Sequence, residues 1–96
     1  MTSCNISDPA DLDAAALEWA EGRADQALRQ MSNAAQAGKD SLAKLDAAQS
    51  SVARAKYLSQ FHQTVHDWEV ARDALAVAND AIRAIHERQL RRCLTT

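Results

Sequence analysis

Apolar side chains recur at three- and four-residue spacing over the first part of the chain, which is the period of one helix face. Asp8 can accept hydrogen bonds from the first free amides of a helix, and Pro9 suits the first helical position. Gly38, followed by Lys39 and Ser41, combines a helix stop with a new N-cap. The pattern predicts a helix over about residues 9–37 and a turn at 38–40. Its expected seam is Leu17, Ala20, Ala24, Ala27, Leu28, Met31, Ala34 and Ala35.

From Ser41 to about residue 93 the helical period continues without Gly or Pro. Two apolar seams, rotated relative to each other, follow in this region. A single helix over 41–93 would be about 80 Å long and would extend past the first helix. A bend near 56–64 would divide it. The first seam is Leu42, Leu45, Val52 and Ala55, and the second is Trp68, Ala71, Leu75, Ala78, Ile82 and Ile85.

These elements predict an all-α protein with one helical domain over residues 8–96 and a flexible N-terminal tail over 1–7. Two Gly and one Pro in 96 residues are too few for the turns of a β fold. The chain is either an antiparallel helical hairpin or a small three-helix bundle. Since 21 residues are alanine, the core is thin for the length, and we expect dimerisation to complete it.

The charge balance argues against nucleic acid as a partner. Eleven basic and thirteen acidic residues give a formal net charge of −2. Acidic residues gather where the first helix begins and arginines where the last helix ends, as helix dipoles favour. No apolar run reaches 18 residues and no secretory leader is recognisable, so we expect no membrane contact and a cytoplasmic location.

Two cysteines, Cys4 and Cys93, lie near opposite ends of the chain and fit no redox or zinc spacing. They are either free thiols in a reducing cytosol or a bridge within or between chains. A bridge needs an oxidising compartment.

The segment Gly38-Lys39-Asp40-Ser41-Leu42 resembles the GxDSL motif of acyl and peptidyl carrier proteins. That resemblance covers these five residues and implies that Ser41, at the start of a helix, receives a phosphopantetheine arm. A capping turn selects the same residue types, since Gly ends helices and Asp and Ser begin them. A carrier-like protein modified at Ser41 is therefore the alternative function.

His62 and His66 share one helix face, with the spacing of the zinc-protease HExxH motif. Gln63 stands where that motif has its general-base glutamate, and an amide cannot take up a proton. No other catalytic constellation has a spacing above chance. We predict no enzyme activity, no metal and no cofactor.

Trp19 lies off the seam of the first helix, near Leu12 and Arg23, and these three residues are the predicted partner-binding surface. A second set is predicted to form either the dimer contact or the core seam. We therefore expect a non-catalytic protein–protein interaction module of bacterial or phage type: a small helical regulator, inhibitor or chaperone-like adaptor. The second set is Phe61, Val65, Trp68, Leu75, Ile82 and Ile85.

Overall fold

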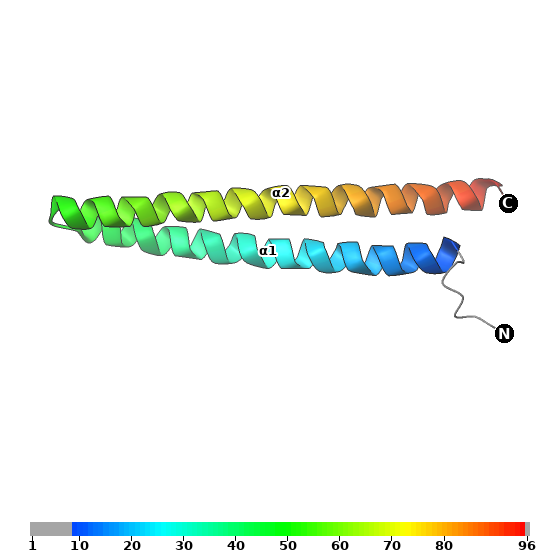
Figure 1. Ribbon diagram of the computed structural model, residues 1–96, viewed down its shortest axis with the longest axis horizontal. Helices are drawn as coiled ribbons and strands as arrows, with labels where there is room; N and C mark the ends of the chain where they lie inside the picture. Colours follow the sequence, from blue (N-terminus) through cyan, green and yellow to red (C-terminus); the bar gives the residue numbers. More distant parts are fainter. Residues whose placement is uncertain (1–8, 96) are drawn as a thin grey trace.

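Two long helices form an antiparallel hairpin (Figure 1). The computed structural model describes residues 9–95: helix α1 spans Pro9–Ala47, helix α2 spans Ser51–Thr95, and residues 48–50 connect them. The described part of the chain contains no strand. The all-α class and the hairpin alternative are confirmed. The predicted tail over residues 1–7 lies outside the described residues.

The turn predicted at 38–40 is wrong, because α1 continues through Gly38 for another nine residues. Gly38 keeps a helical backbone without positive φ. It lies where α2 approaches most closely: a Cβ at this position would lie 3.2 Å from Thr64 Oγ1 and 3.8 Å from the Phe61 ring. Close packing between the helices, rather than reversal of the chain, accounts for this glycine.

The chain reverses at residues 48–50, about ten residues later than predicted. The Ser50 side chain accepts a hydrogen bond from the amide of Ala53, at 3.1 Å, and so caps the first turn of α2. The predicted helix over 41–93 and its bend near 56–64 are wrong for one reason. Leu42 and Leu45 belong to α1 but Val52 and Ala55 belong to α2, so the first predicted seam spans the chain reversal, and α2 runs unbroken from Ser51.

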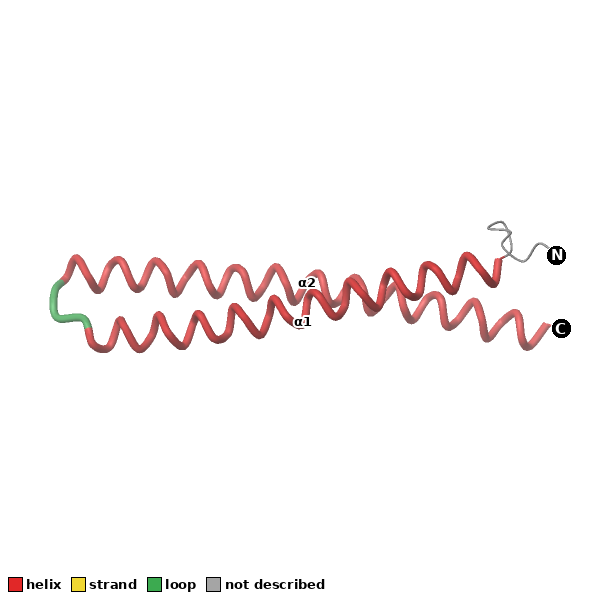
Figure 2. The backbone as a smooth tube through the Cα atoms, turned by 90° about the horizontal axis from the view of Figure 1, so that it is seen from below, coloured by secondary structure: helices red, strands yellow, loops and turns green. Residues whose placement is uncertain are grey.

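The contact between the helices follows rows of residues seven apart, the repeat of a left-handed coiled coil. The helices accordingly cross in the view of Figure 2. α1 contributes mainly small side chains, and α2 contributes larger ones that are half-buried. Among the residues that the structure describes, no large side chain is completely buried. The rows of α1 are Ala20, Ala27, Ala34 and Ser41, and Leu17, Ala24, Met31, Gly38 and Leu45; those of α2 are Tyr57, Thr64, Ala71, Ala78 and Ile85, and Phe61, Trp68, Leu75 and Ile82.

The two glycines of α1 allow a test of this packing. At Gly22 an added Cβ would meet nothing within 4 Å. We expect Gly22→Ala to raise the free energy of unfolding by about 1 kcal/mol, the helix-propensity difference. Gly38→Ala gains the same propensity but presses on Thr64 Oγ1, which is held by its hydrogen bond to the Phe61 carbonyl at 2.7 Å. Urea unfolding should therefore show a smaller gain or a loss for Gly38→Ala. Equal gains for the two variants would contradict close contact at Gly38.

Candidate functional site

The three residues predicted to bind a partner form an exposed surface on the outside of α1. Trp19 is 66% exposed and Leu12, seven residues earlier on the same line of the helix, is 49% exposed. The Arg23 guanidinium lies 5.6 Å from the centre of the Trp19 ring. Gly22 adds no side chain next to the ring. We call Leu12, Trp19 and Arg23 the Trp19 face; Arg23 also borders a groove that Ala74 of α2 lines.

The predicted dimer or core seam of α2 divides into two groups. Phe61, Trp68, Leu75 and Ile82 are half-buried and Ile85 is only 4% exposed, all on the rows that face α1. These five residues form the core seam of the hairpin. Val65 is 40% exposed and lies beside this seam rather than in it.

A shallow apolar groove of about 220 Å³ runs along one side of the seam. Its walls are Ala35 and Leu42 from α1 and Val65 and Trp68 from α2, with Lys39 at its border. Exposed leucines extend it at seven-residue spacing, Leu28 before Ala35 and Leu58 before Val65. We call this surface the apolar edge: Leu28, Ala35, Leu42, Leu58, Val65 and the outer sides of Phe61 and Trp68.

Sequence reasoning missed the apolar edge because it assigned Leu28, Ala35 and Leu42 to core seams. All three are exposed in the structure. Each lies four positions after a residue of the row Ala24, Met31 and Gly38, about 40° around the helix, and so on the flank of that row. A strict seven-residue repeat distinguishes the buried row from the exposed row beside it. Counting apolar residues at three- and four-residue spacing assigns both rows to one face.

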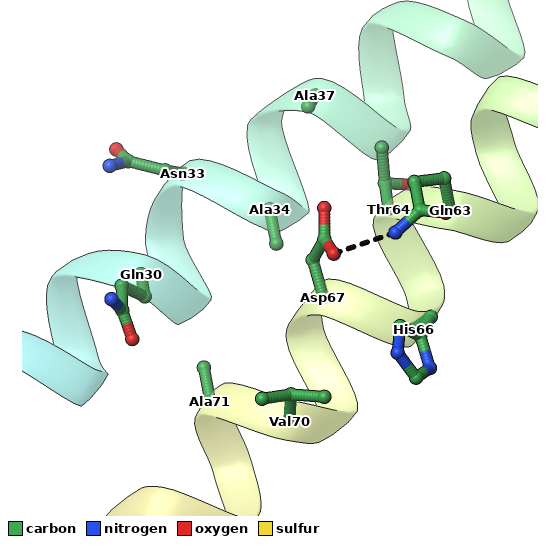
Figure 3. A pocket seen from close by; sticks show the side chains of 10 residues that line it. All are labelled: Gln30, Asn33, Ala34, Ala37, Gln63, Thr64, His66, Asp67, Val70 and Ala71. Carbon is green, nitrogen blue, oxygen red and sulfur yellow. Dashed lines mark hydrogen bonds between the residues drawn. The ribbon is translucent and has the colours of Figure 1, made fainter.

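The opposite side of the seam carries a polar groove of about 650 Å³ (Figure 3). Gln63 Nε2 donates a hydrogen bond to Asp67 Oδ1 at 2.9 Å within it. His66 also lines this groove, and His62 is exposed. Residues 9–95 contain no group of three or more His, Cys, Asp or Glu side chains placed to hold a metal ion. The absence of a metal requirement stays a prediction.

An ion cluster joins the helices at the open end of the hairpin. Asp13, 6% exposed, accepts hydrogen bonds from Arg92 and, at 3.2 Å, from Arg88. The hydrogen bond from Arg92 is the main cause that lowers the pKa of Asp13, and the bond from Arg88 and both positive charges add to it, against the opposing effect of burial. The sequence attributed the charge asymmetry to helix dipoles. The structure shows that part of it is this cross-helix pairing.

Ser41 lies inside α1 and is 6% exposed, so its predicted place at a helix start is wrong. An arm attached to its hydroxyl would have to fit inside the contact with α2. The structure therefore lacks the accessible helix-start serine that the carrier motif implies.

The chain ends contribute two further observations. Cys93 is exposed near the end of α2, and Cys4 lies outside the described residues. No helix within residues 9–95 is both long and apolar enough to cross a membrane.

Comparisons with protein-family models, with curated proteins and with solved structures gave no significant match to this chain. Its function is therefore argued from its own surfaces.

Proposed function

We propose that this chain is a non-catalytic protein-interaction module whose Trp19 face binds a partner protein. The carrying observation is the exposed Trp19 ring, which lies outside the core with Arg23 stacked on it. Trp and Arg are enriched among the residues that dominate binding energy in protein interfaces. A stacked guanidinium also holds the ring in one orientation, which lowers the ordering cost of binding.

The shape of the hairpin supports an adaptor rather than a catalyst. The radius of gyration is 21.0 Å, whereas a compact domain of this length has about 12.5 Å. Two helices side by side expose both faces along 70 Å and leave only shallow grooves between them. Such a surface suits contact with another protein, as in a regulator, an inhibitor or a chaperone-like adaptor.

Charges on the same half of α1 indicate the chemistry of the partner. Glu18, Glu21 and Asp25 are exposed within two turns of Trp19. Their combined negative field favours a partner whose surface carries Lys or Arg. Association with such a partner should weaken as the ionic strength rises.

Trp19→Ala tests the proposal. We expect the variant to keep the helicity and melting temperature of the wild type, because the ring is 66% exposed. Its affinity for a partner captured with the wild-type chain should fall by about 30-fold, which corresponds to about 2 kcal/mol. Titration of that purified partner by isothermal calorimetry measures the change.

Val52→Ala is the matched control, since Val52 is 80% exposed but lies at the loop end of the hairpin. It should bind the partner as the wild type does. Equal binding by Trp19→Ala, or loss of its fold, would show that the Trp19 face is not the binding surface.

A further inference from the structure

We propose that a second copy of the chain covers the apolar edge, so that two hairpins form a four-helix bundle about a two-fold axis parallel to the helices. In this bundle the loops lie at the same end, and α1 of each copy packs against α2 of the other. The inference goes beyond the Trp19 face and does not depend on it, because Trp19 projects away from this contact.

The first argument is the extent of apolar surface that one hairpin leaves uncovered. On one side of the seam, Leu28, Leu42, Leu58 and Val65 are each 40–51% exposed. From Leu28 to Leu42 this surface extends over about 21 Å of helix. The equivalent level of the other side carries a polar groove with Gln63 and other amide side chains. At this level the larger continuous apolar surface therefore lies on the side of the apolar edge.

The second argument is the charge of the same side toward the open end. On α1, Glu21 continues the row of Leu28, and Glu18 continues the row of the groove residue Lys39, each at multiples of seven residues. On α2, Arg72 and His86 continue the row of Val65 in the same way. Arg83 lies on the neighbouring row, four residues after Asn79 of the Val65 row. Toward the open end the α1 edge thus carries Glu18 and Glu21, and the α2 edge carries Arg72 and Arg83 with Glu69 on the row of Arg83.

The register of the hairpin places one acidic residue of α1 and one basic residue of α2 at the same height along the helix axes. Asp13 contacts Arg88, and five residues toward the loop on each helix stand Glu18 and Arg83. Because a parallel two-fold axis places α1 over α2 of the second copy, Glu18 then lies beside the second copy's Arg83. The Arg83 side chain is 68% exposed in the single hairpin and pairs with the similarly exposed Asp80 at 3.3 Å, so it can re-pair at little cost.

The perpendicular two-fold axis matches the surface less well. That axis would place α1 over α1 of the second copy with the loops at opposite ends. Full overlap centred on the middle of α1 would then put Leu42 against the acidic half of the other hairpin and leave the Leu42 and Leu58 surfaces without an apolar partner. The parallel axis brings Ala35 and Leu42 to the height of Val65 and Leu58 of the second copy, and Glu18 to the height of its Arg83.

The available area is sufficient for a stable dimer. The hairpin is about 70 Å long, and two helices side by side, each about 10 Å across with side chains, present a side about 20 Å wide. Its loop half alone offers on the order of 800 Å², which is what each partner buries in a standard-size interface. Small residues such as Ala35 in the groove allow the helices of the second copy to approach closely.

Sedimentation velocity on the full chain tests the dimer and its face. The wild type should sediment as a dimer at micromolar concentration. Val65→Asp should raise the dimer dissociation constant by about 30-fold or more. Val70→Asp, the same change on a 55% exposed residue of the polar groove, should leave it unchanged. Leu42→Asp provides a second edge variant on the other helix, and circular dichroism checks that each variant keeps its helicity.

A charge exchange tests the axis. Glu18→Arg and Arg83→Glu should each raise the dissociation constant by about fivefold, since the two-fold axis repeats each contact. The double variant should return to the wild-type value. The proposal would be overturned by a monomeric wild type or by equal effects of Val65→Asp and Val70→Asp. It would also be overturned if one edge variant lost its fold and the other left the dimer intact. Failure of the double variant to recover would overturn the parallel axis. None of these results bears on Trp19→Ala, so the two proposals fail separately.

Discussion

Trp68→Ala should lower the free energy of unfolding by about 3 kcal/mol. Trp68 is the largest side chain on the core rows and packs, half-buried, at the level of Ala34 and Gly38. The small residues of α1 cannot expand to fill the space that the indole leaves. The loss therefore includes both the transfer of apolar surface and a cavity. Guanidinium unfolding followed by circular dichroism measures it.

Trp19→Ala is the natural control, because it makes the same chemical change on a residue that also carries an arginine one turn later. The Arg23–Trp19 and Arg72–Trp68 pairs have ring distances of 5.6 and 5.4 Å, so both variants lose an equivalent cation–π contact. Only the buried area and the packing differ. A similar loss of stability in the two variants would contradict the assignment of Trp68 to the core. Protein concentrations below the dimer dissociation constant keep association out of the comparison.

Asp13→Asn should lower the melting temperature at neutral pH, because Arg88 and Arg92 lose the carboxylate that joins them to α1. The folded state lowers the pKa of Asp13, so the ionised carboxylate contributes stability above its ordinary unfolded pKa of about 3.9. That contribution is lost as the pH falls through the lower folded-state pKa. The difference between wild type and variant should thus be fully present at neutral pH and shrink in acid below about pH 4.

Asp25→Asn controls for the change in net charge, since Asp25 lies on the exposed surface of the same helix. Thermal melts of the wild type, Asp13→Asn and Asp25→Asn across pH separate the stability contributed by the cross-helix ion pairs from the effect of net charge. A pH-independent difference for Asp13→Asn would show that the ion cluster does not hold the open end together.

The sequence was sufficient for the class of fold because apolar periodicity and the scarcity of Gly and Pro each favour helices. It misplaced the turn because Gly38 carries two different signals. Glycine ends helices through its backbone freedom, but it also permits close approach of a second helix, and only the position of Thr64 decides between the two. The actual turn at 48–50 contains neither Gly nor Pro and is marked mainly by the Ser50 cap.

The candidate surfaces were predictable to different degrees. Trp19 was recognisable because its distance from a seam of small residues depends only on local helical geometry. The ion cluster was not, since Asp13 and Arg92 are 79 positions apart and meet only once the loop sets the register. The apolar edge depends on the same register, because Ala35 and Val65 become neighbours only when α2 starts at Ser51.

The seven-residue rows of the seam also mean that the length of the hairpin is set in equal steps. Each repeat adds about 10.5 Å to both helices and presents the next residues in the same orientation. Matched insertion or removal of one repeat in α1 and α2 would change the separation between the loop and the open end while keeping the rows in phase. The distance between the Trp19 face and the loop is thereby fixed by the number of repeats, and it can change in equal steps without altering the contact between the helices.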